Sequence, residues 1–547
     1  MVIIMLILNE KSLQDREAWE SAGFVLPKFD RSGISERTFN EPKWLHFGAG
    51  NIYRAFIADI QQQLLDEGLQ DTGLIVADGF DGEIIDSAYT PYDNLCINVI
   101  LKSNDNVEKK VIASTLESLK MDGQDFLRLK DIFASESLQL LSLTITEKGY
   151  SLKNGEGVFF DDVAADFVAG PASPVSFLGK LASLCYHRYL NGAAPLTLVS
   201  MDNVSSNGKC LHEAVRSFAE EWVKSGHAEA GFSGYVDDPC KLSFPWTMID
   251  KITPGPDDDI AQLLRDSGLD ISNKIVTAKK TEVAAFVNAE ETGYLVIEDS
   301  FPNGRPPLEK AGVIMTDRET VNKVEKMKVC TCLNPLHTSL AVFACLLRIP
   351  RVSECMKDED IIRLVDLVAE EGMPVVVEPG IISPQEFVDT VINVRLPNPF
   401  IPDTPQRIAT DTSKKLSVRF GETIKAYANS DSLDVNSLRA IPLSLAGWCR
   451  YLVGIDDFGN KFPLDPDPML PELEPIFEGM SLGDTPLGRN VPLRNVSKAL
   501  IPLLSNATIF GIDLYEVGVG QRVEEYFEEM MKGPGAVRRV LYSLTAF

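Results

Sequence analysis

One short stretch in the second half of the chain crowds several reactive side chains together. It runs from Glu325 to Leu340, EKMKVCTCLNPLHTSL, and holds Lys328, Asn334 and His337. A lysine whose pKa is lowered by burial or by a neighbouring cation can remove a proton from an alcohol. Amide N–H groups can stabilise the oxygen as it gains negative charge. The residue types therefore fit chemistry at a hydroxyl-bearing carbon, and a metal site is the competing interpretation.

The metal interpretation rests on Cys330, Cys332 and His337. Zinc sites usually hold three or four ligands, with paired spacings such as two residues between cysteines. Here one residue separates the cysteines, and the sequence supplies no second pair. Cysteines in an apolar run are more often small core residues. We expect packing rather than metal binding at both cysteines, and no metal cofactor.

The same stretch predicts the start of a helix. Asn334 and Pro335 fit an N-cap and first helical position, and the helix would run towards Arg348. Asn334 and His337, three residues apart, then share one face. Lys328 cannot share that face on a regular helix, so it approaches from the preceding segment or the helix bulges. Structural roles for all three, as a cap, a core histidine and a surface charge, stay open at this point.

A glycine turn near the N-terminus indicates a nucleotide site. KWLHF predicts a strand and the residues after the turn predict a helix, so backbone N–H groups can face a pyrophosphate. The third glycine of the dinucleotide fingerprint is replaced by Tyr53, so the motif is incomplete. The candidate cofactor-binding residues of the turn are Gly48, Ala49, Gly50 and Asn51.

The next strand, GLIVAD, ends in Asp78, which bears on the choice of cofactor. Its carboxylate can accept a hydrogen bond from a ribose hydroxyl and would repel a 2′-phosphate. The following DGFDGE contains no lysine or arginine to offset that charge. These residues predict NAD rather than NADP.

Apolar runs alternating with helical patterns predict an α/β fold for the first half of the chain. Further strands are expected at residues 138–146 and 195–200, with an antiparallel insertion at LCINVILK and KKVIAST. After the proline- and glycine-rich FPNGRPP the periodicity is mostly helical. We predict a Rossmann-like NAD-binding domain with insertions at residues 1–300, followed by a mainly α-helical substrate and catalytic domain at 301–547.

Composition limits the possible partners. The formal net charge of the 547 residues is −27, which disfavours nucleic acid. The opening MVIIMLIL lacks a basic flank and is too short to span a membrane, so it predicts a buried strand. Nine cysteines without framework spacing fit a reducing compartment. We expect a cytoplasmic protein acting on a small molecule; the oligomeric state stays open.

Several motifs in order resemble one known family across nearly the whole chain. They are LPKFDR, HFGAGNIYRA, SLTITEKGY, MDNVSSNG, FPWTMIDKITP, VIEDSFPNGRPPLEKAGV, EKMKVCTCLNPLHTSLA, NPFIPDTPQRIATDTSKKL and YLVGIDDFGN. Together they resemble the mannitol dehydrogenase family of long-chain polyol and sugar-acid dehydrogenases. The resemblance implies NAD-dependent, metal-independent and lysine-assisted hydride transfer at a secondary alcohol.

The resemblance also implies residue roles. The catalytic set is Lys328, Asn203, Asn334 and His337, and the substrate-binding set is Asp250, Arg407 and Lys415. The sequence departs from the family in one place. Five residues separate the lysine from the asparagine, where the family usually has four.

The substrate is the least determined feature. Arg407 and Lys415, with Arg395, could hold a terminal carboxylate, which favours interconversion of D-fructuronate and D-mannonate. The same cations could orient uncharged hydroxyls, so mannitol 2-dehydrogenase or tagaturonate reductase activity is the alternative. The altered lysine spacing adds a third reading, a catalytically silent NAD-binding sensor.

Overall fold

The computed structural model describes residues 5–103, 106–483 and 500–545 and divides the chain into two compact units. The first is Met1–Asn322 and the second is Lys323–Phe547. The division falls inside helix α11 (Arg318–Met327), whereas the sequence had suggested a boundary near residue 300. FPNGRPP therefore lies within the first unit.

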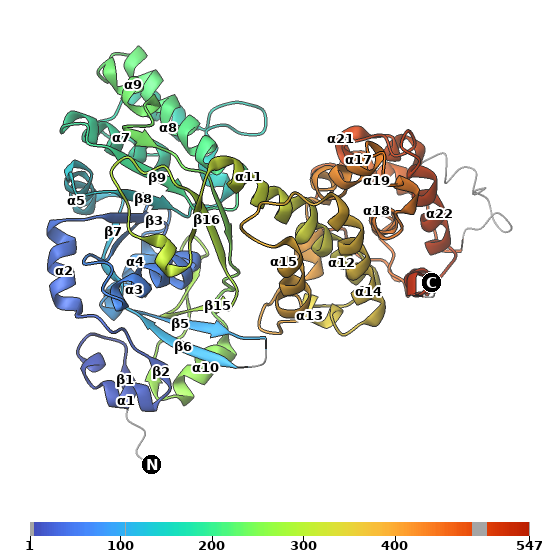
Figure 1. Ribbon diagram of the computed structural model, residues 1–547, viewed down its shortest axis with the longest axis horizontal. Helices are drawn as coiled ribbons and strands as arrows, with labels where there is room; N and C mark the ends of the chain where they lie inside the picture. Colours follow the sequence, from blue (N-terminus) through green and yellow to red (C-terminus); the bar gives the residue numbers. More distant parts are fainter. Residues whose placement is uncertain (1–4, 104–105, 484–499, 546–547) are drawn as a thin grey trace. The chain divides into compact units, whose positions relative to one another are not determined.

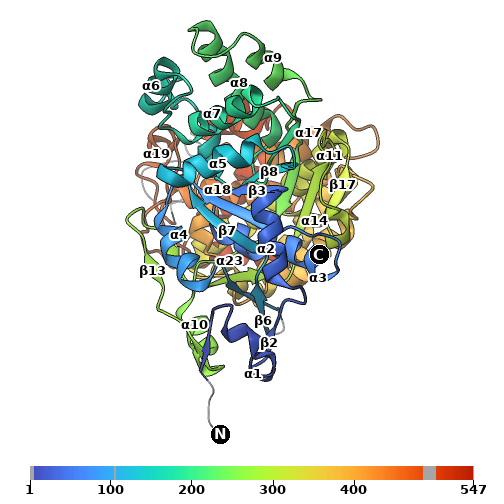
Figure 2. The ribbon, with the colours of Figure 1, turned by 90° about the vertical axis from the view of Figure 1, so that its left-hand side faces the viewer.

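The first unit is built on a six-stranded parallel sheet (Figures 1 and 2). Its strands lie in the order β10-β9-β8-β3-β4-β7. Numbered along the chain and read from β7, this order is 3-2-1-4-5-6, the arrangement of dinucleotide-binding domains, and it reverses between β3 and β8. The strands are β3 (Trp44–Phe47), β4 (Leu74–Asp78), β7 (Thr115–Lys120), β8 (Leu140–Leu143), β9 (Leu196–Ser200) and β10 (Leu242–Ser243).

Helices cover both faces of this sheet. Because side chains alternate along a strand, Leu45 and Phe47 join one buried cluster while Trp44 joins another. The first cluster packs α5 (Gly123–Ala134), α7 (Phe177–Leu190) and α8 (Asn207–Lys224) on the sheet, and the second packs α3 (Ala58–Asp66) and α4 (Glu83–Ala88). The remaining helices of this unit are α1 (Arg16–Ser21), α2 (Arg31–Asn40), α6 (Asp161–Ala169), α9 (Gly231–Asp237) and α10 (Asp258–Asp266).

Smaller sheets complete the first unit. The predicted antiparallel insertion is confirmed as β5 (Cys96–Leu101) and β6 (Val107–Ile112), within a sheet of order β15-β5-β6-β2. A third sheet has the order β11-β16-β17. The opening apolar run forms the two-residue strand β1 (Leu6–Ile7), in which Leu6 is buried and Ile7 is exposed; residues 1–4 lie outside the described part. The other strands named here are β2 (Phe24–Val25), β11 (Thr247–Asp250), β15 (Phe286–Glu290), β16 (Tyr294–Glu298) and β17 (Ile314–Thr316).

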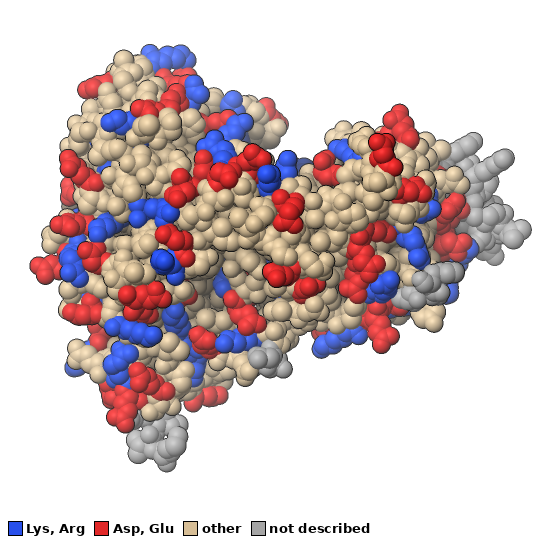
Figure 3. Space-filling model, viewed as in Figure 1, with Lys and Arg blue, Asp and Glu red and all other residues tan. Residues whose placement is uncertain are grey.

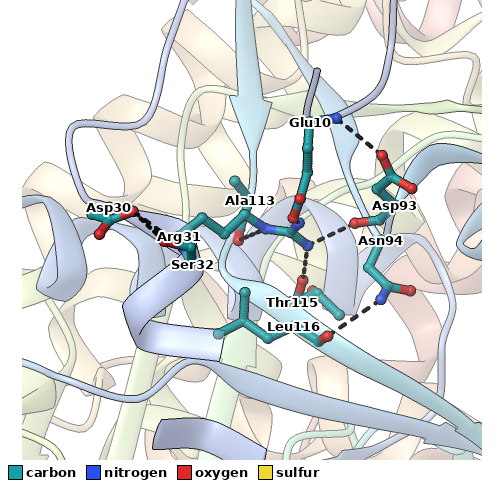
Figure 4. Close-up of polar contacts among 9 residues, drawn as sticks. All are labelled: Glu10, Asp30, Arg31, Ser32, Asp93, Asn94, Ala113, Thr115 and Leu116. Atoms are coloured by element: carbon teal, nitrogen blue, oxygen red, sulfur yellow. Dashed lines mark hydrogen bonds and ion pairs between the residues drawn. The ribbon is translucent and has the colours of Figure 1, made fainter. Parts of the chain in front are cut away.

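The LPKFDR motif has a structural role that Figure 4 makes visible. Arg31 donates from Nε to the carbonyl of Ala113 (3.1 Å) and from Nη2 to the carbonyls of Asp93 (2.6 Å) and Thr115 (2.9 Å), and it pairs with Glu10. Burial lowers the pKa of Arg31 to about 10. One guanidinium thus ties the N-terminal segment to a turn and to the start of β7.

The second unit is helical, as predicted. Helix α12 (Asn334–Leu347) lies at its centre and packs against α14, α16 and α18. The helical periodicity expected after FPNGRPP is confirmed, with α12, α14, α18 and α22 among its longest helices. The helices besides α12 are α13 (Val352–Cys355), α14 (Glu359–Gly372), α15 (Pro384–Thr390), α16 (Pro405–Ala409), α17 (Glu422–Ala428), α18 (Ala440–Leu452), α19 (Leu470–Phe477), α21 (Ala507–Phe510), α22 (Gly520–Met530) and α23 (Ala536–Thr545).

One helical run in the described residues is long and apolar enough to cross a membrane by length and composition alone. It spans Arg318–Leu347, and 78% of its most apolar 18-residue window is buried inside the protein. Core helices of globular proteins pass the same test. The burial identifies this run as a core helix.

The surface carries both signs of charge. On the face drawn in Figure 3, carboxylates and cationic side chains are interspersed, with no continuous basic stripe on that face. This pattern fits the acidic balance of the composition.

Candidate active site

The carboxyl ends of β3 and β8 meet at the reversal of strand order, where α/β sheets of this kind bind ligands. Gly48 adopts φ +109°, and a Cβ there would lie 2.2 Å from the carbonyl oxygen of Thr144. Close packing of the two strands therefore requires glycine at position 48. His46 bonds Ser142 Oγ (2.6 Å) and Thr144 Oγ1 (2.9 Å), and burial lowers its pKa to about 3, so it is a neutral link between the strands.

The open part of the glycine turn begins at Gly50. A Cβ on Gly50 would meet no atom within 4 Å, and the helix starts at Asn51, where first-turn N–H groups have no partner within the helix. An anion can approach backbone donors here. Asn51 Nδ2 donates to the carbonyl of Pro254 (3.5 Å), which anchors the turn. The turn therefore fits a pyrophosphate.

The residue in place of the third glycine is accommodated by a π-helical turn, Tyr53–Ile57. Tyr53 is fully buried, stacks on His46 with ring centroids 4.5 Å apart, and bonds Thr115 through its hydroxyl (2.8 Å). The extra residue per turn shifts the buried face. Ile52 and Phe56, on the same helical segment, are only half-buried.

Asp78 holds the glycine turn from the end of β4. Its Oδ2 accepts the N–H of Ala49 (3.0 Å), and its Oδ1 accepts those of Phe80 (2.9 Å) and Asp81 (2.6 Å). Burial raises the pKa of Asp78, and these three bonds act in the opposite direction. The N–H of Ala49 is thus committed to Asp78. One lone-pair position on Oδ2 remains for a ribose hydroxyl.

A strained residue in the loop after β8 was not singled out from the sequence. Thr146 adopts φ 66°, an outlier for a β-branched residue, and its N–H donates to Asp202 Oδ1 (3.0 Å). Asp202 Oδ2 also accepts from Ile145 N (2.8 Å) and the Tyr150 hydroxyl (2.6 Å). Strained backbone concentrates at functional sites. The signal in the sequence was an aspartate directly beside Asn203.

The first unit holds one predicted catalytic residue, Asn203, and one predicted substrate-binding residue, Asp250. Asn203 is exposed just after β9, and Asp250 is buried at the end of β11. The buried Asn207 links the end of β9 to the start of β11: its Nδ2 donates to the carbonyl of Ser200 (3.4 Å) and to Thr247 Oγ1 (2.8 Å), and its Oδ1 accepts the N–H of Thr247 (3.0 Å). A satisfied buried amide network of this kind fixes β9 and the start of β11 relative to each other.

The predicted catalytic lysine lies in a π-helical turn in the second unit. The turn spans Lys328–Cys332, and Leu333 N donates to the carbonyl of Lys328 (3.1 Å). Lys328 is only 3% exposed, whereas Lys326 is exposed. A π turn accommodates a one-residue insertion, and such turns are frequent at functional sites. Of the two possibilities left by the sequence, the helix bulges.

A π turn at this position can offset the rotation that one additional residue adds to a helix. An α-helix turns by about 100° per residue, so five steps cover roughly 500° and a π turn lets six steps cover nearly the same angle. The π turn therefore offsets most of the rotation that one additional residue would add up to Leu333, whose φ −131° and ψ −61° separate the turn from α12.

Asn334 and His337 are the accessible positions of α12. The other twelve of its fourteen residues are buried. The N-cap is Leu333, which makes no side-chain capping bond, so the prediction that Asn334 caps the helix is wrong: Asn334 is already the first helical residue. The bulge displaces the helix start by one residue. Two polar side chains three residues apart thus share the one face of α12 that is not packed away.

The cysteines of this stretch pack as expected. Cys332 is fully buried and Cys330 is half-buried. Burial raises the pKa of Cys330 to about 11 and that of Cys332 to about 12, so both thiols are protonated at neutral pH. Within the described ranges no group of three or more His, Cys, Asp and Glu side chains could hold a metal ion.

Cations gather beside α12. Arg407, on α16, binds Asp403 through Nε (2.7 Å) and Nη2 (2.6 Å), with a side chain 72% exposed. This pairing uses one edge of the guanidinium and leaves the Nη1 end for another acceptor. Arg419 donates to Thr338 Oγ1 (2.6 Å), next to His337. Arg419 was missed by sequence reasoning, although it follows Lys415 at helical spacing.

Lys415 is held against the backbone. Its Nζ donates to the carbonyls of Ile408 (3.3 Å) and Thr410. Burial, with the nearby charge of Arg419 as a smaller cause, lowers the pKa of Lys415 to about 8. An anion arriving here would meet an amine that changes charge close to neutral pH.

Strand order, glycine turn and terminal Asp78 define the first unit as a dinucleotide-binding domain, and the second unit presents a buried lysine beside polar and cationic side chains. Comparison with known families agrees. The mannitol dehydrogenase Rossmann domain model matches residues 42–310, and the mannitol dehydrogenase C-terminal domain model matches residues 320–484. The chain belongs to the mannitol dehydrogenase family, which confirms the resemblance and the expected fold class.

Individual relatives span nearly the whole chain. A D-mannonate oxidoreductase of Thermotoga maritima is 50% identical over 538 residues, covering 98% of each chain. A mannitol 2-dehydrogenase of Emericella nidulans is 28% identical over 85% of this chain and 88% of its own. A solved mannitol 2-dehydrogenase of Pseudomonas fluorescens, in complex with NAD and D-mannitol, superimposes with a TM-score of 0.70 at 24% identity over 99% of both chains, a likeness of fold.

Proposed function

We propose that the protein is an NAD-dependent oxidoreductase that interconverts D-fructuronate and D-mannonate. The observation that carries the proposal is the 50% identity, over 98% of both chains, to a D-mannonate oxidoreductase. We further propose that it acts in the cytoplasm on a small sugar acid or polyol. Its nine free thiols are consistent with a reducing compartment.

The residues of the first unit fit the cofactor. Gly50 and Asn51 would present N–H groups to the pyrophosphate, Gly48 would keep the strand ends close, and Asp78 would accept a ribose hydroxyl. Bound NAD supplies the hydride acceptor of alcohol oxidation. The polypeptide has to bind the substrate, orient it and transfer the hydroxyl proton.

Lys328 is the proposed general base. It would take the hydroxyl proton during oxidation and return it during reduction. Asn334 and Asn203 would donate amide N–H groups to the reacting oxygen, and His337 would position the lysine or the sugar chain. Asp250 would bind a substrate hydroxyl. Burial of Lys328 and the angular compensation by the π turn argue against the reading as a silent sensor.

The substrate carboxylate would be bound by the cations of the second unit. The open Nη1 end of Arg407 and the ammonium of Lys415 are suited to an anion, and Arg419 adds a further positive charge. A polyol offers no such partner. These cations favour a sugar acid over mannitol.

Oxidation of mannitol is the second candidate. It is favoured by the family membership and by mannitol 2-dehydrogenase relatives that are 28% identical over 85% of the chain. The carboxylate-binding cations distinguish the two candidates, since they contribute charge pairing only to a sugar acid.

Turnover against a substrate panel tests the proposal. NADH oxidation would be followed with fructuronate, tagaturonate and fructose, and NAD reduction with mannonate and mannitol. We expect the highest kcat/KM for fructuronate and mannonate. Faster turnover of fructose or tagaturonate would reassign the substrate, and intact NADH binding without any turnover would support the sensor reading. Activity should survive exhaustive chelation; loss restored by zinc would overturn the metal-independent mechanism.

A further inference from the structure

A hairpin distant in sequence is docked on the loop that follows Asp78. It consists of β13 (Ile275–Val276) and β14 (Glu282–Val283), paired antiparallel. Thr277 Oγ1 donates to Asp81 Oδ2 (2.6 Å), and Ala278 N–H donates to Glu83 Oε2 (2.6 Å). Both carboxylates belong to the loop and helix start after β4. The tip of the hairpin is therefore fixed beside the ribose-binding residue.

This docking brings a cation to a loop that has none in its own sequence. Lys279, at the tip, places Nζ 5.3 Å from the centroid of the Phe80 ring. The Phe80 side chain is 72% exposed, while its backbone N–H is bonded to Asp78 Oδ1 (2.9 Å). An ammonium and an aromatic face thus border the position where Asp78 can accept a ribose hydroxyl. An exposed aromatic ring is a platform on which a base can stack.

We propose that Lys279 is a specificity-determining residue of the cofactor site, which sets how strongly a phosphorylated ribose is rejected. The inference rests on the proposed nucleotide site. The carboxylate of Asp78 disfavours a 2′-phosphate, and the ammonium of Lys279 offsets part of that repulsion. Asp78 is buried and hydrogen-bonded to the turn, whereas Lys279 is exposed and screened by solvent. NAD is therefore preferred, but the margin over NADP depends on Lys279.

The test uses ligands that lack the nicotinamide, so it needs no turnover. Binding of ADP-ribose and of 2′-phospho-ADP-ribose to the full chain would be measured by calorimetry for wild type and for K279A, K279E and K279R. For K279A we expect roughly three- to tenfold weaker binding of the phosphorylated ligand, with ADP-ribose changed less than about twofold. K279E should increase the difference in affinity between the two ligands, and K279R should restore the wild-type difference. All three effects should shrink at high salt.

The matched control is the neighbouring Lys280, which adopts φ 65°. K280N removes the same charge with a residue that tolerates this backbone. Equal losses of affinity for the phosphorylated ligand in K279A and K280N would show that the charge of the whole hairpin acts, and would overturn the specific role of Lys279. An unchanged ratio of the two ligand affinities in K279A would overturn it as well. Wild type that binds neither ligand would instead refute the nucleotide site itself. These exposed substitutions leave the contacts of Thr277 and Ala278 in place, so folding is preserved.

Discussion

The backbone N–H of Leu333 donates to the carbonyl of Lys328 across 3.1 Å, five residues back along the chain. This π-type bond orients the proposed base. Lys328→Ala should lower kcat by about two to four orders of magnitude, the usual contribution of a general acid or base. NADH affinity should change little. Lys326→Ala, at an exposed position, is the control; loss of turnover there with an active Lys328→Ala would reassign the base.

The spacing itself can be tested. Deleting the half-buried Cys330 should convert the π turn to an α turn while preserving the angle between Lys328 and Asn334. We expect kcat within about tenfold of wild type, in the range of supporting rather than chemical groups. Inserting an alanine after Cys330 cannot be absorbed in the same way and should abolish turnover. Thermal unfolding of both variants separates catalytic loss from misfolding. An inactive but fully folded deletion variant would contradict the compensation.

Asn334 is expected to act on the reacting oxygen, because it is not the cap of α12. Asn334→Ala should cost about 3 kcal/mol in transition-state stabilisation, measured from kcat/KM. Loss of a cap would instead cost about 1 kcal/mol of folding stability. Measuring both kcat/KM and the free energy of unfolding distinguishes a role at the reacting oxygen from a role as a helix cap. A loss of stability without a matching loss of rate would favour the structural role.

Binding of a carboxylate substrate should depend on pH through Lys415. Burial lowers its pKa to about 8, so the ammonium is present below that pH and is lost as the pH rises through it. Affinity for the sugar acid should be highest near pH 7. Above pH 8 it should fall with rising pH, by at most roughly tenfold for each pH unit. Inhibition by a non-reacting sugar acid gives this affinity directly. Lys415→Arg should move the limb to higher pH, and a pH-independent affinity would place the carboxylate elsewhere.

Arg407 should discriminate between substrates. Arg407→Ala removes one charge-assisted contact, which typically costs roughly 1.5–3 kcal/mol, or about ten- to a hundredfold in kcat/KM. Fructuronate should be penalised much more than fructose. Because Asp403 loses its partner in this variant, Asp403→Asn with Arg407 retained serves as the control. Equal penalties for the two substrates would assign the arginine to hydroxyl binding or to support of the fold.

The strands and long helices were predictable because each buries a continuous apolar face. β3, β4, β8 and β9 are buried along their whole length and mostly apolar, and α12 is apolar almost throughout. Local periodicity records such burial directly. The Gly48 turn was found from its glycine spacing between a predicted strand and a predicted helix, and the structure adds that close packing against Thr144 permits only glycine at position 48.

The parts of the site that escaped prediction depend on backbone irregularity or on distant residues. The π turn at Lys328 moves the helix start past the expected cap, and the one at Tyr53 shifts the buried face of its helix. Lys279 reaches Phe80 across 199 residues of sequence through a docked hairpin, and Asp202 reaches Thr146 through a strained turn. Neither contact leaves a periodic trace in the sequence.

The π turn at Lys328 also bears on how relatives are found. Insertions are normally looked for in loops, yet here the additional residue lies within a buried helix that carries the proposed base. A search pattern with a fixed number of positions between lysine and asparagine would discard this chain, and an alignment that moves the gap into a neighbouring loop would pair the wrong lysine. The gap should be placed between Lys328 and Leu333, because the π turn there holds one residue more than an α turn.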